Sequence, residues 1–167
     1  THTAGTVGAV GNNGVGVTGV NWNCKLIPLR FLGPTGGFTS DAVLAVNYCR
    51  TNNIKVSNNS WGGGGFTQSL FDAINNSKTV GHLFVAAAGN SNINMEVSQQ
   101  YPGGYNLDNI ICVASTTNDD LRSSFSNYGS VSVDIGAPGS TILSTYLNSG
   151  YAYLSGTSMA CPHVAGG

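Results

Sequence analysis

Ser158 is the residue of this chain whose surroundings most favour covalent chemistry. It follows Ser-Gly-Thr and precedes MACPHVAGG, a small and apolar run that predicts the first turns of a helix. A serine in a first helical turn lies beside backbone N–H groups that have no helical partner, at the positive end of the dipole. Those groups could stabilise the oxyanion formed when the hydroxyl attacks a carbonyl carbon. A serine that only caps the helix is the alternative.

Strands and helices alternate along the chain. We expect helices at 39–53 and 66–78, the first capped by Thr39 or Ser40. The predicted strands are 25–32, 54–61, 81–89 and 109–116, followed by short ones near 131–135, 141–145 and 151–154. This order predicts an α/β fold with a mostly parallel sheet and helices on its faces.

Three polar loops follow the predicted strands. They read NNSWGGGG (58–65), AAAGNSN (86–92) and LSGTSMA (154–160), and all are rich in glycine, serine or asparagine. Ligands of parallel sheets bind outside the carboxyl ends of the strands. The sequence therefore predicts that these loops meet at one site around Ser158.

Composition excludes several classes of partner. The net charge is −1 and only 8% of residues are charged, so no basic surface indicates nucleic acid or an anionic membrane. No apolar run approaches the roughly 20 residues that span a bilayer. The four cysteines have no metal-ligand spacing; free buried thiols are the favoured interpretation, and a disulfide such as Cys24–Cys49 is the alternative.

The segment GTSMACPHVAGG resembles the nucleophile motif of the subtilisin-like serine proteases (subtilases, peptidase family S8). VAAAGN (85–90) and NNSWGG (58–63) match further motifs of that family in the family's order, as do YPGGY and GAPGSTILST. The resemblance covers essentially the whole chain. It implies a three-layer α/β fold with a mostly parallel sheet flanked by helices, and a serine endopeptidase that acts through an acyl-enzyme.

The resemblance also implies roles for individual residues. Ser158 would be the nucleophile, and the Asn90 side chain with the Ser158 N–H would hold the oxyanion. The substrate would pair with Ser60, Trp61 and Gly62, with Gly36 and Gly37 on the partner strand bordered by Phe38, and Ala87, Ala88 and Gly89 would form one wall of the S1 pocket. Trp61 could equally be a core residue. Gln100 near the pocket base argues against a deep charged pocket, and a cis peptide is expected before Pro102.

The proton relay is not expected within these residues. The family's histidine motif reads H-G-T-H-x-A-G-T with the first histidine catalytic, and Thr1 and His2 match its third and fourth positions. We therefore expect the catalytic histidine two residues before Thr1 and the orienting aspartate further upstream. His2 and His163 match structural histidines, and His82, just before a strand, is expected near the surface.

Residues 1–167 are accordingly expected to form a partial peptidase domain, truncated at both ends. It would begin inside the histidine motif, end inside the helix of the serine motif and be inactive alone. A non-catalytic subtilase-like binding or scaffold domain is the alternative. An α/β-hydrolase esterase is disfavoured because no G-x-S-x-G elbow occurs.

The loop VGNNGVGV (10–17) resembles the family's calcium loop. The Val10, Val15 and Val17 carbonyls and the Asn13 side chain would supply oxygens to a structural Ca²⁺, and no organic cofactor is expected. The partner would be a peptide or protein substrate. We expect a monomer whose parent carries a propeptide and is secreted or held in a secretory or vacuolar compartment. Asn58 and Asn75 begin N-x-S sequons, of which Asn75 is the accessible one.

Overall fold

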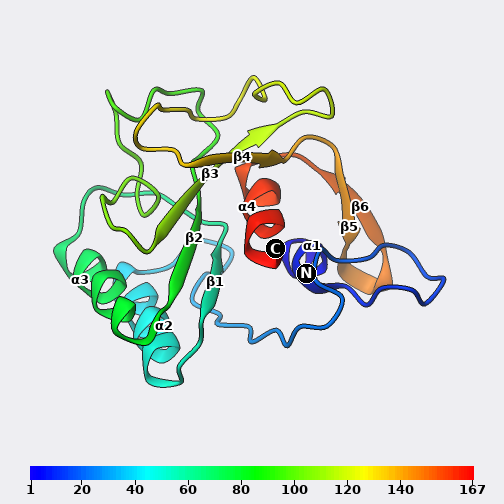
Figure 1. The fold of residues 1–167 in the computed structure, drawn as a ribbon, viewed down its shortest axis with the longest axis horizontal. Helices are drawn as coiled ribbons and strands as arrows, with labels where there is room; N and C mark the ends of the chain where they lie inside the picture. The colour runs from blue at the N-terminus through cyan, green and yellow to red at the C-terminus, as the bar shows by residue number, and fades with distance from the viewer.

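Four parallel strands in the order β1-β2-β3-β4 form the central sheet (Figure 1). The structure is a computed structural model that describes residues 1–167. The strands are β1 (Val56–Asn59), β2 (Leu83–Ala87), β3 (Ile110–Thr116) and β4 (Ile135–Pro138). The pairing register aligns Asn59 with Ala86 and Ala87 with Val113, so the carboxyl ends of the first three strands lie at one edge.

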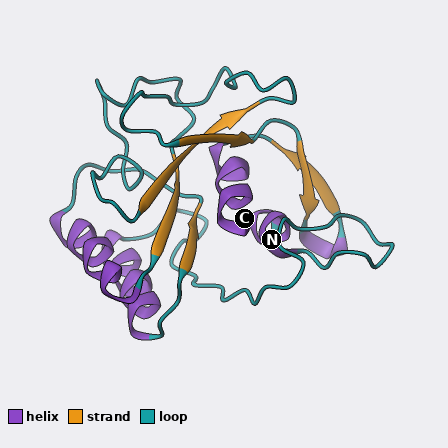
Figure 2. Ribbon diagram, in the orientation of Figure 1, coloured by secondary structure: helices purple, strands orange, loops and turns teal.

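Strand β2 shows how the sheet is buried on both faces. Phe84 and Ala86 pack into one cluster with side chains of α2 (Thr39–Thr51) and α3 (Gln68–Ser77). Val85, which points the opposite way, packs with Ala160 of α4 (Thr157–Gly166). Figure 2 shows the helices on the two sides of the strands. The three-layer α/β fold expected from the sequence is confirmed.

Helix α1 (His2–Gly8) packs against α4 and against a separate antiparallel ribbon of β5 (Ile142–Thr145) and β6 (Tyr151–Leu154). Two short 3₁₀ turns, η1 (Lys78–Val80) and η2 (Leu147–Ser149), follow α3 and β5. The termini lie close together beside α4 (Figure 1). No helix combines the length and the apolar character that crossing a membrane requires.

Some predicted elements were wrong. Residues 25–32 form no strand, and Leu26 and Ile27 are about half exposed. An apolar run becomes a strand only when a neighbour completes its hydrogen bonds, and no segment of this chain pairs with it. Strand β4 begins at Ile135, where the expected strand should have ended. Helix α2 is capped by Phe38 without a side-chain hydrogen bond, so neither Thr39 nor Ser40 is the cap.

All four cysteines are free thiols, so the alternative Cys24–Cys49 disulfide was wrong. Cys49, Cys112 and Cys161 are buried as expected, but Cys24 is exposed. Burial raises the pKa of both Cys112 and Cys161 to about 12. Cys24 lies in a loop that follows α1, and the apolar residues of the segment WNCKLI around it stay outside the core.

Candidate active site

The loops at the carboxyl ends of β1 and β2 and the start of α4 enclose one cleft of about 240 Å³. Thirteen residues line it, and none carries a charge. Ser158, Asn90 and Trp61 come from the three segments that the sequence predicted to meet. The cleft is therefore where the predicted chemistry would occur.

Ser158 lies in the first turn of α4, directly after Gly156 and Thr157. Its backbone N–H makes no hydrogen bond, as expected for the first turn of a helix. Its hydroxyl donates to the Ser60 carbonyl at 3.4 Å. The hydroxyl that the sequence predicts to be the nucleophile and one free backbone N–H thus belong to the same residue.

Ser60 supports this turn of the helix through a second contact. Pro162, four residues after Ser158, has no N–H to donate to the Ser158 carbonyl. The Ser60 hydroxyl donates to that carbonyl instead, at 2.9 Å, and accepts from the Asn58 amide at 3.0 Å. Ser60 and Ser158 thus each donate a hydroxyl hydrogen bond to the other's carbonyl, which joins the segment after β1 to the start of α4.

Asn90 is held by its amide oxygen. That oxygen accepts from the Thr157 backbone N–H at 2.8 Å and from the Thr157 hydroxyl at 3.0 Å. The Thr157 hydroxyl in turn accepts from the Gly89 N–H at 3.1 Å. With its oxygen fixed, Asn90 leaves the Nδ2 hydrogens unbonded and exposed at the cleft. The side chain is oriented to donate rather than accept there.

Asn127 lies beneath the Asn90 loop and is 1% exposed. Its Oδ1 accepts from the backbone N–H groups of Ser91 and Ile93, and its Nδ2 donates to the Ala88 carbonyl. A Cβ at Gly89, where φ is +105°, would lie 2.4 Å from this Nδ2. Only glycine allows so close an approach in that backbone conformation.

The proposed substrate edge is only partly assembled. Trp61 and Gly62 line the cleft, and Trp61 also packs edge-on against Phe31 at 5.0 Å between ring centroids. Trp61 therefore belongs partly to the core, and its contact with substrate stays a prediction. Gly36 forms a tight turn with Gly33, and neither Gly36 nor Gly37 lines the cleft. Their pairing with substrate stays a prediction.

Ala87, Ala88, Gly89 and Gln100 also line the cleft. The Tyr101–Pro102 peptide is cis, as expected from the sequence. Tyr101 contributes to the lining, and its carbonyl accepts from the Gly63 N–H at 3.1 Å. Three of these residues have small side chains or none, and the polar amide of Gln100 is uncharged.

None of the three histidines hydrogen-bonds to Ser158. His2 is buried, with Nε2 3.0 Å from both the Ile142 and Ala152 carbonyls of the ribbon, which agrees with a structural role. Nδ1 of His163 lies 2.8 Å from the Met159 carbonyl of its own helix. A base for Ser158 is not among them.

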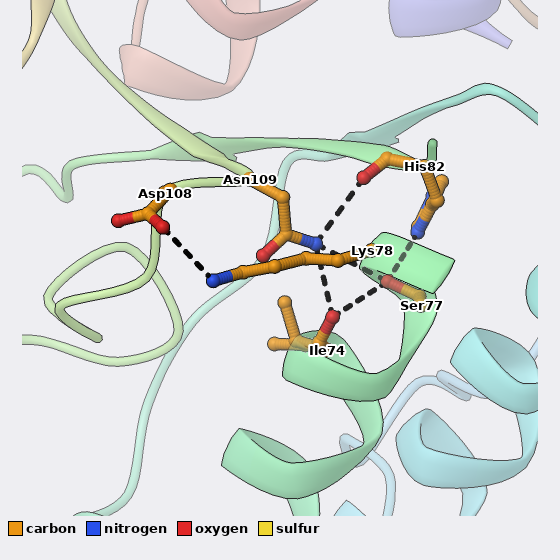
Figure 3. Close-up of polar contacts among 6 residues, drawn as sticks. All are labelled: Ile74, Ser77, Lys78, His82, Asp108 and Asn109. Carbon is orange, nitrogen blue, oxygen red and sulfur yellow. Dashed lines mark hydrogen bonds and ion pairs between the residues drawn. The ribbon is translucent and has the colours of Figure 1, made fainter. Parts of the chain in front are cut away.

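The prediction that His82 lies near the surface was wrong: it is 1% exposed. Nδ1 lies 2.9 Å from the Ser77 hydroxyl (Figure 3), and Nε2 lies 2.9 Å from the Ser57 hydroxyl. Ser77 uses its only hydrogen to donate to the Ile74 carbonyl, so His82 Nδ1 must be the donor. Burial lowers the pKa of His82. The hydroxyls of α3 and β1 compensate the imidazole for lost water.

The comparisons with known proteins identify the family of the chain. The model of the subtilase family matches residues 1–167. The chain belongs to the subtilase family. It is 45% identical to thermitase of Thermoactinomyces vulgaris over 99% of this chain and 58% of that protein. It is 43% identical to an extracellular protease of Xanthomonas campestris, over 99% of this chain and 31% of the relative.

A solved structure of proteases from Pseudoalteromonas arctica superposes with a TM-score of 0.91 at 39% identity. The match covers 99% of this chain and 56% of that one. The chain therefore spans about a third to three fifths of the length of these relatives.

Two residues of this subtilase cleft were missed by sequence reasoning. Thr157 could have been found, since it directly precedes Ser158 within the segment GTSMACPHVAGG. Asn127 gives no local signal: it follows Ser-Phe-Ser in a loop with no regular structure. Only the folded chain shows that it lies under the Asn90 loop.

Proposed function

We propose that the protein containing this chain is a serine endopeptidase in which Ser158 forms the acyl-enzyme. Its hydroxyl would attack the scissile carbonyl carbon while a general base takes the hydroxyl proton. The same base would pass that proton to the leaving amine as the C–N bond breaks. The main support is the orientation of Asn90, whose amide oxygen is engaged by Thr157 while its Nδ2 stays free beside Ser158.

The oxyanion would be held by two donors, Asn90 Nδ2 and the Ser158 N–H. The developing negative charge then meets preorganised dipoles rather than water. In subtilisin, the loss of an asparagine donor of this kind costs about 10²–10³ in turnover. We place the base and its orienting aspartate before Thr1, because the histidines of this chain are engaged elsewhere.

We infer that the substrate is an extended peptide. Backbone at Ser60–Gly62 would pair with it as an added strand, and its side chain would enter the cleft beside Trp61. Since no charged side chain lines the cleft, an uncharged residue should be preferred before the scissile bond. The names of relatives as extracellular proteases support a secreted protein.

A structural calcium ion is proposed for residues 10–17. The loop is curved by positive φ at Asn12, Gly14 and Gly16, which suits inward-facing carbonyls. Asn13 Oδ1 accepts from the Val15 N–H at 3.0 Å and keeps a second lone pair for a cation. Val10, Val15 and Val17 would add carbonyl oxygens. A bound Ca²⁺ would stabilise the loop against unfolding.

Hydrolysis of peptide p-nitroanilides by the full-length protein tests the proposed activity. The wild type should cleave them, and Ser158→Ala should lose more than about 10³-fold in kcat. Ser155→Ala, which changes an exposed serine of the same loop, should keep activity. A wild-type protein without peptidase activity that still binds peptides would favour the binding or scaffold alternative.

A further inference from the structure

We propose that Asn127 is a positioning residue for the oxyanion hole, holding the loop that presents the Asn90 amide. The inference rests on the proposed function, since it assigns a role within the same site. Asn127 borders the cleft but is 1% exposed, and its side-chain polar atoms are bonded to the loop, so it would not hold the oxyanion itself. It would act through the backbone on both sides of Asn90.

Four hydrogen bonds connect Asn127 to that loop. Oδ1 accepts from Ser91 N at 2.9 Å and from Ile93 N at 3.1 Å. Nδ2 donates to the Ala88 carbonyl at 2.8 Å, and the Asn127 backbone N–H donates to the Gly89 carbonyl at 2.9 Å. The groups it holds lie on both sides of Asn90, two before it and two after. The turn that carries Asn90 is therefore closed by one residue.

Asn127 is itself fixed to the sheet. The neighbouring Ser126 hydroxyl accepts from the Ser115 N–H of β3 and donates to the Asn127 carbonyl, both at 2.9 Å. Ser126 is fully buried. Ser126 thus fixes Asn127 relative to β3, and Asn127 in turn fixes the Asn90 loop. These hydrogen bonds are buried, where water does not compete for them.

Thr157 fixes only the amide oxygen of Asn90, so the Cα position of Asn90 depends on the loop. If Asn127 were lost, Ser91 N, Ile93 N and the Ala88 carbonyl would lack their partners, and the turn would relax. A donor misplaced by about 1 Å can cost about 10²-fold in rate. The loss should appear in the chemical step rather than in substrate binding.

Asn109 provides a matched control. It is also a buried asparagine that bridges backbone groups, with Nδ2 donating to the Ile74 carbonyl at 2.9 Å and the His82 carbonyl at 3.2 Å (Figure 3). It immediately precedes β3 and lies at the amino end of the sheet, outside the cleft. Its removal should destabilise the protein without altering Asn90.

The experiment measures kcat and KM of the full-length protein and of five variants. The single variants are Asn127→Ala, Asn109→Ala and Asn90→Ala. The double variants combine Asn127→Ala or Asn109→Ala with Asn90→Ala. Asn127→Ala should lower kcat by about tenfold to hundredfold with KM changed less than about threefold. In the Asn90→Ala background the same change should cost less than about threefold. Asn109→Ala should lower the melting temperature and leave kcat within about twofold.

An equal loss of kcat from Asn127→Ala with and without Asn90, or a kcat within twofold of wild type, would overturn the assignment. If Asn127→Ala does not fold, Asn127→Asp gives the same comparison, because it keeps the acceptor for Ser91 and Ile93 but loses the donor to Ala88. Ser158→Ala separates the two proposals. Full activity of Ser158→Ala would contradict both the proposed function and the role of Asn127. If Ser158→Ala is inactive and Asn127→Ala behaves like Asn109→Ala, only the role of Asn127 is contradicted.

Discussion

Asn90 and Thr157 are joined by two hydrogen bonds to a single oxygen: the Asn90 Oδ1 accepts from both the backbone N–H and the hydroxyl of Thr157. An asparagine amide can be turned by 180° about its last bond, which would exchange donor and acceptor. Two donors on one oxygen remove that freedom. The Nδ2 group is thereby committed to the side where the oxyanion would form.

Thr157→Val should therefore weaken catalysis without removing any proposed oxyanion donor. It deletes the hydroxyl that fixes Asn90 and leaves the Gly89 N–H without its acceptor. A loss of about 1–2 kcal/mol of transition-state stabilisation, roughly fivefold to thirtyfold in kcat/KM, is expected. Thr79→Val, which removes an exposed hydroxyl bonded to the Asn76 carbonyl at the end of α3, serves as the control. Equal activity of the two variants would contradict the role of Thr157.

The contact between Ser60 and the Ser158 carbonyl predicts an energetic coupling with Pro162. Ser60→Ala leaves that carbonyl without a donor and should lower the free energy of unfolding by about 1–3 kcal/mol. In a Pro162→Ala background a helical N–H becomes available to the same carbonyl, so the cost of Ser60→Ala should be smaller.

A double-mutant cycle by urea unfolding measures this coupling, with Ser158→Ala in every variant to prevent self-digestion. Additive effects of the two substitutions would show that the Ser60 hydroxyl does not replace a helical hydrogen bond.

His82 predicts a loss of stability on acidification. Its pKa in the folded protein is lowered from the ordinary 6.5 by burial, so below that pH the unfolded chain binds a proton that the folded one resists. The stability is thus fully present above pH 6.5 and falls as the pH drops toward the folded pKa. His82→Gln should lose less stability between pH 8 and pH 5, as measured by urea unfolding. An unchanged slope in His82→Gln would contradict this account.

Thiol reactivity should distinguish Cys24 from the other cysteines. Cys24 is exposed, whereas burial raises the pKa of Cys112 and Cys161 to about 12 and also raises that of Cys49. Since the thiolate is the reactive form, native protein should react at one of these four positions and unfolded protein at all of them. Mass spectrometry after iodoacetamide treatment locates the label. Native-state labelling of Cys161 would argue against the packing of α4 on the sheet, and labelling of Cys112 against its packing with Ala88 and Met95.

Much of the fold follows from the sequence because the sheet is buried on both faces. The apolar run of β2 predicts such a strand, and Phe84 and Val85 indeed pack against helices on opposite sides of the sheet. The prediction of a strand at 25–32 was wrong because apolar character does not specify a pairing partner. The prediction for His82 was wrong because the sequence does not show its hydroxyl partners, Ser57 and Ser77, which are 25 and 5 residues away.

The cleft was predictable where chemistry is written in local motifs, as at Ser158 and Asn90. The supports of those residues were not, because they depend on contacts between distant segments. Asn127 is 36 residues from Ser91, and Ser60 is 98 residues from Ser158. Such partners can be assigned only after the loops have been brought together.

The most direct test of the central claim is the site of covalent labelling in the full-length protein by a fluorophosphonate, which traps an activated serine. The account predicts one adduct, located by mass spectrometry on Ser158, that is absent from Ser158→Ala and greatly slowed in Asn90→Ala. An adduct on another serine, or labelling that persists unchanged in Ser158→Ala, would contradict it.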